Sequence, residues 1–114
     1  MQLVERVTVL SRRLPPEERY GLRSQMSRCA TSVPSNIAEG WVRESWKDKV
    51  RFLSIAHGSL AELNTQLLIC MRVGWLTSED LAPSLQLAND VARMLTKLKR
   101  AWRRRTTSPQ PPIT

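Results

Sequence analysis

The sequence has few of the residues that carry most catalytic and metal chemistry. Its 114 residues include two cysteines, Cys29 and Cys70, and one histidine, His57. The cysteines form no C-x-x-C pair, and no acid or cysteine pattern with metal-ligand spacing surrounds His57. We therefore predict no catalytic site, no metal site and no cofactor, and hence no enzyme. The cysteines are interpreted as free buried thiols, and His57 as a solvated or interface residue.

A secretory signal and a membrane anchor are also missing. The N-terminus lacks the basic region followed by an apolar run that marks a secretory signal. No apolar stretch approaches the roughly 20 residues that a membrane-spanning helix needs. These absences predict a cytoplasmic protein with no membrane contact, and 114 residues are enough for one ordinary domain.

Aromatic residues make up only 5% of the chain, and its four glycines and seven prolines divide it into segments. No segment alternates apolar and polar residues for long enough to predict a strand. Apolar residues instead recur at spacings of three and four, which is typical of helices with one buried face. Four helices are predicted, over residues 1–14, 17–43, 46–73 and 77–104. The predicted buried stripe of the second helix is Leu22, Met26, Cys29, Val33, Ile37 and Trp41. That of the third helix is Leu53, Ala56, Leu60, Leu63, Leu67 and Cys70, and that of the fourth is Leu81, Leu85, Ala88, Val91, Leu95, Leu98 and Trp102.

Local signals support these boundaries. The diproline after the first helix stops it. Ser45 and Thr77 each begin a capping box, and Gly74 suits the left-handed position after the third helix. Pro34 lies inside the second helix, where it is expected to kink the helix or restart it, with Ser32 as the cap of the restarted helix.

Short connections between consecutive helices favour antiparallel neighbours. The predicted fold is all-α, an antiparallel up-down-up-down four-helix bundle with a truncated first helix. The bundle domain is predicted over residues 1–105. Residues 106–114 hold three prolines and no charged side chain, which predicts a disordered tail. The first helix begins already in register, which indicates that its N-terminal turns are missing from this sequence.

The charge balance favours a polyanionic partner. Lys and Arg number 18 against 10 Asp and Glu, which gives a net charge of +8 and a pI of about 10.8. Six of the basic residues lie close together, without an intervening acid, near the end of the fourth helix: Lys97, Lys99, Arg100, Arg103, Arg104 and Arg105. The helix macrodipole accounts for one or two cations there. Six mutually repelling charges are better explained by phosphate binding.

A second basic strip surrounds the turn between the first two helices. It consists of Arg12, Arg13, Arg19, Arg23 and Arg28. We expect this turn to lie at the same end of the bundle as the C-terminus of the fourth helix, so that the two clusters form one polycationic end. Trp102 lies within the first cluster. It suits base stacking, but its place on the apolar stripe favours core packing.

Four polar side chains share one face of the second helix, at spacings of four, three and four residues: Ser32, Asn36, Glu39 and Arg43. A polar site and an intersubunit contact are both compatible with this spacing. The favoured interpretation is that Ser and Asn side chains satisfy backbone groups that Pro34 leaves unpaired.

Two long stretches of the chain resemble the 23S rRNA intervening-sequence four-helix-bundle proteins. They are residues 14–40 (LPPEERYGLRSQMSRCATSVPSNIAEG) and 51–76 (RFLSIAHGSLAELNTQLLICMRVGWL), and their most specific parts are residues 18–22, the S-x-P-x-N-x-A-E-G run and residues 58–63. The matching family signature positions are Pro34, Asn36, Glu39 and Gly40. The resemblance supplies no catalytic residue to carry over.

The resemblance implies a bacterial protein with an antiparallel four-helix bundle that forms a homopentamer. A distant relative, the accessory protein of diversity-generating retroelements, is a basic pentamer that associates with nucleic acid and with a reverse transcriptase. Family members usually carry further residues before Met1. The short first helix is therefore expected to expose apolar surface that oligomerisation covers.

Two functions follow from these observations. The favoured one is a non-enzymatic, basic, oligomeric bundle protein that binds nucleic acid, RNA rather than DNA, through phosphate contacts. The alternative is a protein-interaction scaffold for a polymerase or a ribosome-associated partner.

Overall fold

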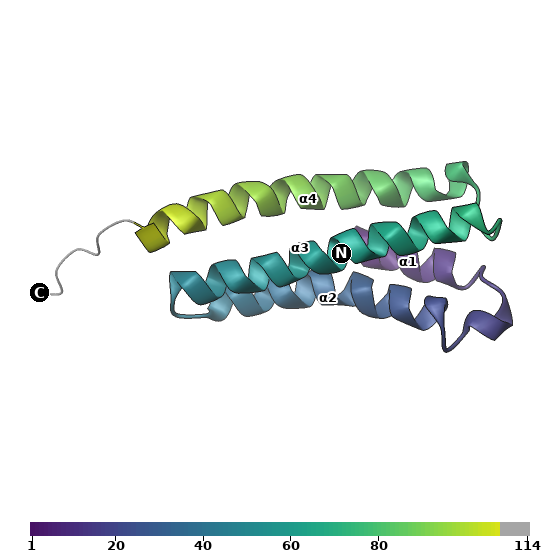
Figure 1. The fold of residues 1–114 in the computed structure, drawn as a ribbon, viewed down its shortest axis with the longest axis horizontal. Helices are drawn as coiled ribbons and strands as arrows, with labels where there is room; N and C mark the ends of the chain where they lie inside the picture. The colour runs from purple at the N-terminus through teal and green to yellow at the C-terminus, as the bar shows by residue number, and fades with distance from the viewer. Residues whose placement is uncertain (108–114) are drawn as a thin grey trace, which may run out of the picture.

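The computed structural model describes the backbone of residues 1–107 as four α-helices and one short 3₁₀ helix. Helix α1 spans Gln2–Ser11, η1 Pro16–Glu18, α2 Leu22–Val42, α3 Trp46–Arg72 and α4 Ser78–Thr107. Consecutive helices run antiparallel, and α1 lies along only one half of the bundle (Figure 1). The predicted bundle with a short first helix is confirmed.

The end of α4 differs from the sequence prediction. The helix includes Thr106 and Thr107, which the sequence assigns to the disordered tail. The rest of the predicted tail, residues 108–114, lies outside the described residues.

The predicted capping residues close the turns between the helices. At the start of α3, Ser45 Oγ accepts a hydrogen bond from a backbone amide three residues on, at 3.1 Å. At the start of α4, Thr77 Oγ1 accepts from the Asp80 amide at 3.1 Å. The Asp80 carboxylate in turn accepts from the Thr77 amide at 2.9 Å, which completes a reciprocal capping box. Gly74 follows α3 with a φ of +86°, a conformation that favours glycine.

Helix α3 lies at the centre of the packing, because its contacts with α2 and with α4 are the two most extensive between helices. Its buried face is the stripe that the sequence predicts, with side chains at most 1% exposed: Leu53, Ala56, Leu60, Leu63, Leu67 and Cys70. Helix α1 buries Leu3, Val7 and Leu10 and contacts both α2 and α4. Full burial of one leucine contributes about 1.5–3 kcal/mol, so these stripes hold the bundle together.

Helix α2 continues without a break through Pro34, so the predicted restart with Ser32 as its cap is wrong. Packing on both sides of the proline offsets the one backbone hydrogen bond that it removes. Ser32 instead bonds Ser59 of α3, with 2.8 Å between the two hydroxyl oxygens. The Asn36 side-chain amide donates to the carbonyl and the hydroxyl oxygen of Ser32, both at 2.8 Å. This polar network therefore joins α2 to α3.

The short α1 leaves part of α2 uncovered. An apolar hollow of about 410 Å³ lies there, lined by Met1, Pro34, Ile37, Ala38, Trp41 and Val42. Trp41 is 66% exposed, although the sequence assigns it to the buried stripe of α2. The exposure arises because no turn of α1 lies beside this end of α2 (Figure 1). The expected exposure of apolar surface is confirmed.

Gly40 allows α2 and α3 to approach closely beside the turn that joins them. An added Cβ at Gly40 would lie 3.1 Å from the Lys49 carbonyl oxygen and 3.2 Å from the Cβ of Phe52. Both atoms are fixed by the α3 backbone, so Gly40→Ala is expected to push the helices apart. We predict a loss of about 1–3 kcal/mol in the free energy of unfolding, measured by urea denaturation.

The matched control for this substitution is Gly58→Ala, because an added Cβ at Gly58 meets no atom within 4 Å. This change is expected to be neutral or to stabilise α3, since alanine favours helix. An unfolding free energy of Gly40→Ala equal to that of the wild type would contradict the close contact between α2 and α3.

Candidate nucleic-acid interface

An apolar stripe holds the last turns of α4 against the rest of the bundle. Leu95 is 0% and Trp102 is 8% exposed, and Leu98 is partly buried between them. The basic side chains therefore project from a packed helix rather than from a loop. All six predicted cations lie on this part of α4, which we call the basic end of α4: Lys97, Lys99, Arg100, Arg103, Arg104 and Arg105.

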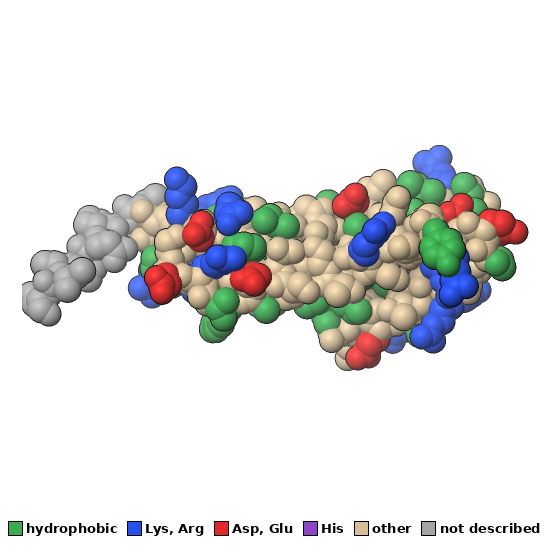
Figure 2. Space-filling view, turned by 90° about the horizontal axis from the view of Figure 1, so that it is seen from below, with side chains coloured by type: hydrophobic (Ala, Val, Ile, Leu, Met, Phe, Trp, Pro, Cys, Tyr) green, Lys and Arg blue, Asp and Glu red, His purple; other side chains and the backbone are tan. Residues whose placement is uncertain are grey.

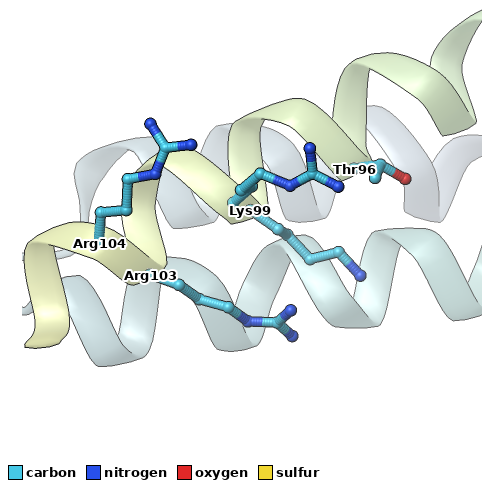
Figure 3. Close-up of a pocket in the computed structure, with 5 residues that line it drawn as sticks. Thr96, Lys99, Arg103 and Arg104 are labelled. Carbon is cyan, nitrogen blue, oxygen red and sulfur yellow. The ribbon is translucent and has the colours of Figure 1, made fainter.

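The basic end of α4 contains a groove of about 400 Å³. Its lining residues are Thr96, Lys99, Arg100, Arg103 and Arg104. Lys99 and Arg103, four residues apart, extend in the same direction from the helix, whereas Arg104 points the other way (Figure 3). Every charged residue in this lining is a cation, so the groove has a positive potential that suits a phosphate group.

The charged side chain of Lys99 is partly buried. Burial lowers the pKa of Lys99, and the nearby Arg103 guanidinium lowers that pKa further. On α3, burial lowers the pKa of His57, and the charge on Lys99 adds to this effect. His57 is thus partly buried and lies near the cations of α4. An anion placed among these groups would favour their charged forms.

The second basic strip does not join the first. Arg13, in the turn after α1, forms an ion pair of 2.7 Å with Asp80 in the first turn of α4. This contact places the strip where α4 begins, not where it ends, so the prediction of one polycationic end is wrong. The reason is the order of the turns. In an up-down-up-down bundle, the first and third turns share one end, and the second turn shares the other end with the C-terminus (Figure 1).

The protein therefore has two separate basic regions. Figure 2 shows Lys and Arg side chains gathered toward the two ends of one face of the molecule. The second strip consists of Arg12, Arg13, Arg19, Arg23 and Arg28 and, like the basic end of α4, it makes contacts within the protein. Arg13 pairs with Asp80, and the Arg19 guanidinium lies 5.6 Å from the centre of the Tyr20 ring. The groove makes the basic end of α4 the stronger candidate for phosphate binding.

Sequence reasoning missed an aromatic cluster beside the basic end of α4. The Trp102 ring centre lies 5.9 Å from that of Trp41 and 6.1 Å from that of Trp46. Lys49 Nζ lies 5.6 Å from the Trp102 ring centre, and the Arg105 guanidinium lies 5.5 Å from that of Trp46. Trp102 itself packs in the core, as its place on the stripe predicts. Its partners come from α2 and α3, so no local spacing in the sequence indicates them.

The described residues contain no group of three or more His, Cys, Asp or Glu side chains arranged to hold a metal ion. In the same part of the chain, no helix has the length and apolar character needed to cross a bilayer. Cys29 is free and partly buried, and Cys70 is free and buried. Burial raises the pKa of both thiols, which lowers their reactivity.

Residues 1–97 match the model of a protein family described as 23S rRNA-intervening sequence protein. The chain belongs to this family. The match ends inside the basic end of α4, so that Lys97 falls within it and the five following cations do not. The family match therefore does not cover most of the basic end of α4.

No curated protein matches the chain. Among solved structures, the chain is similar to a protein with unknown function from the S23 ribosomal protein family of Bacteroides thetaiotaomicron. The two superpose with a TM-score of 0.79 at 21% sequence identity, over 86% of this chain and 92% of the other. At this identity, the similarity shows a shared fold.

The contact between the α1–α2 turn and α4 makes stability depend on pH. The Arg13 guanidinium, together with the Thr77 amide and hydroxyl, lowers the pKa of Asp80 from 3.8 to about 2. Because folding lowers this pKa, the contribution of Asp80 is complete above about pH 3.8 and is lost as the pH falls through about 2. Asp80→Asn is therefore expected to lower the Tm at neutral pH and to reduce the acid-induced fall in Tm.

Thermal unfolding followed by circular dichroism across this pH range measures both effects. Asp90→Asn is the control, because Asp90 pairs with Arg93 of its own helix rather than with another part of the bundle. The control is expected to keep the wild-type pH profile. Coincident profiles for Asp80→Asn and the wild type would show that the ionised Asp80 carboxylate does not contribute to stability.

Proposed function

We propose that this protein is a non-enzymatic, self-associating cytoplasmic protein that binds nucleic acid through phosphate contacts at the basic end of α4, with RNA preferred over DNA. The observation that carries the proposal is the groove on α4, whose charged lining residues are all cations. Each Lys or Arg that meets a phosphate releases condensed counterions, which favours binding at low salt.

Protein stability gives no sufficient reason for this concentration of charge. The helix macrodipole favours cations only in the last turn, whereas the basic end extends from Lys97 to Arg105. Like charges four residues apart, such as Lys99 and Arg103, destabilise an isolated helix by a few tenths of a kcal/mol. Burial lowers the pKa of Lys99, and the Arg103 guanidinium lowers it further. A polyanionic ligand reduces the repulsion among these cations, and this reduction contributes to the free energy of binding.

The preference for RNA follows from the shape of the candidate surface and from the family. The cations project from one helix in several directions, an arrangement that contacts phosphates but does not read base edges in a major groove. Recognition by shape and backbone contacts is the usual mode for structured RNA. The family description also connects its members with 23S rRNA.

Self-association into a pentamer, which the family resemblance implies, would make weak phosphate contacts multivalent. Helix α3 offers an apolar surface for such contacts. Ile55 and Ile69 of α3 and Val73, which directly follows it, are 41%, 42% and 54% exposed, and their spacing places them on one side of the helix. The same surface favours the alternative function, a scaffold for a polymerase or a ribosome-associated protein.

The proposal predicts that positive charge on α4 controls binding. The test variant carries four Arg→Gln changes, at Arg100, Arg103, Arg104 and Arg105. We expect it to lose most of its affinity for structured RNA and for duplex DNA. The slope of log affinity against log salt should fall by about 0.9 for each lost duplex contact. Fluorescence anisotropy with both ligands, at about 50 and 200 mM salt, measures the affinity and the slope.

A matched control removes the same number of charges from the other end of the molecule. It carries Arg→Gln changes at Arg12, Arg19, Arg23 and Arg28 and keeps the Arg13–Asp80 ion pair. Nearly wild-type binding by the control, with loss in the α4 variant, places the site on α4. Equal losses in the two variants would show that net charge, rather than this groove, causes binding. A folded wild-type protein that binds neither ligand at low salt would overturn the proposal and favour the scaffold.

A further inference from the structure

His57 of α3 lies beside the cations of α4. Trp46 of α3 contacts Trp102 of α4, with 6.1 Å between the ring centres, and the two helices run antiparallel. His57 lies about three full turns along α3 from Trp46, so its side chain leaves the helix on the same side, toward the part of α4 that precedes Lys99. Figure 3 shows the Lys99 side chain extending back along α4 in that direction, on the side of Thr96. The charge of Lys99 acts on His57, which also places the two groups close together.

The surroundings of His57 disfavour its charged form. Burial lowers the pKa of His57, and the charge of Lys99 lowers it further. Within the described chain, the buried Nδ1 atom of His57 has no hydrogen-bond partner, so no contact at this nitrogen stabilises an imidazolium. A negatively charged ligand would reverse this balance, because an opposite charge nearby raises the pKa of an imidazole.

Helices α2 and α3 bring no carboxylate to the level of His57. The residues one turn away on α3 are all uncharged: Leu53, Ser54, Leu60 and Ala61. Glu62, the next acid along α3, contacts Cys29 of α2 instead, with 3.4 Å between the carboxylate oxygen and the sulfur. The stretch of α2 that packs beside this part of α3, residues 29–38, contains no charged side chain. These two helices therefore do not neutralise a charge on the imidazole.

Helix α4 brings positive charge to His57. Lys99 acts on it directly, and the Arg103 guanidinium in turn lowers the pKa of Lys99. The nearest acid on this helix, Asp90, forms an ion pair of 2.6 Å with Arg93. His57, Lys99 and Arg103 therefore form a cluster of basic groups from two helices, at the groove that Lys99 and Arg103 line. A concentration of basic groups whose charges disfavour one another is suited to an anionic ligand.

We propose that His57 is part of the anion site at the groove, where Lys99, Arg103 and the protonated imidazole together hold a phosphodiester, so that binding takes up a proton from solvent. This inference rests on the proposed function and adds the proton as a regulator of the same site. A phosphodiester keeps its negative charge over the range in which histidine titrates, about pH 5 to pH 8. The affinity is therefore highest at the acid end of this range and falls as the pH rises through the pKa of His57 in the complex.

The chain contains one histidine, so its imidazole signals in an NMR spectrum need no further assignment. An NMR titration from about pH 5 to pH 8 gives the pKa of His57 in the free protein and in the complex with structured RNA. In the free protein we expect this pKa to lie below its ordinary value of 6.5. RNA is expected to raise it by about 1 or more, as an opposite charge nearby does. An unchanged pKa in a complex that forms normally would overturn the inference and leave phosphate binding intact.

His57→Gln tests the same linkage through affinity. Fluorescence anisotropy with the RNA is measured at about pH 5.5 and pH 8, and the wild type is expected to bind roughly tenfold more tightly at the lower pH. His57→Gln is expected to match the wild type at the higher pH and to gain little on acidification. Titration of the RNA itself affects both proteins equally. Should His57→Gln fail to fold, as thermal unfolding shows, the NMR titration of the wild type decides.

Lys99→Gln tests the cluster without any ligand. Loss of the Lys99 charge is expected to raise the pKa of His57 in the free protein, because it removes the repulsion between them. Lys97→Gln is the matched control for this pKa, since two residues along a helix place its side chain on nearly the opposite side. Equal changes in the two variants would show that net charge, rather than a neighbouring Lys99, acts on His57, and would overturn the cluster.

The outcomes separate this inference from the proposed function. A folded wild-type protein that binds no RNA at either pH overturns both. RNA binding that the four-arginine variant loses, with the same gain on acidification in His57→Gln and in the wild type, overturns only the role of His57. A pKa of His57 that rises on RNA binding, together with a flat pH profile for His57→Gln, supports both.

Discussion

The whole structure depends on the burial of the apolar face of α3. Helices α2 and α4 both pack on it, and the stripe from Leu53 to Cys70 is almost completely excluded from water. Apolar burial is non-directional, so it fixes which faces meet more than how far each helix extends. The buried stripe of α4 therefore extends as far as Trp102, although α1 covers only the other half of the bundle. The basic side chains of α4 lie in this same extended part of the helix.

Trp102 connects the fold to its candidate interface. Its side chain is buried in the core, and its position in the sequence lies within the basic end of α4. The last turns of α4 therefore contain both a core residue and the clustered cations. The partly buried Lys99 shows the cost of this arrangement, because both burial and Arg103 disfavour its charge. The repulsion at this end of α4, together with the groove lined by cations, is the basis on which we propose an anionic ligand.

The two basic regions illustrate how connectivity controls electrostatics. Arg13 and Arg103 both belong to dense basic segments, and composition alone treats these segments alike. The order of the turns sends them to opposite ends, where one contributes an ion pair to Asp80 and the other lines a groove. The family match, which ends at residue 97, covers the first segment and little of the second.

The sequence by itself determined the secondary structure and the fold. Spacings of three and four predicted the buried stripes, and capping boxes at Ser45 and Thr77 marked helix starts, because these signals act within one or two turns. Only the tertiary structure decided which residues of different helices are in contact and which side chains are exposed. Trp41 occupies a stripe position that predicts burial, yet it is exposed because its cover depends on how far α1 reaches. Pro34 carries a local signal for a break, yet packing on both sides keeps α2 continuous. Exposure and proximity depend on all the helices together, so no short segment encodes them.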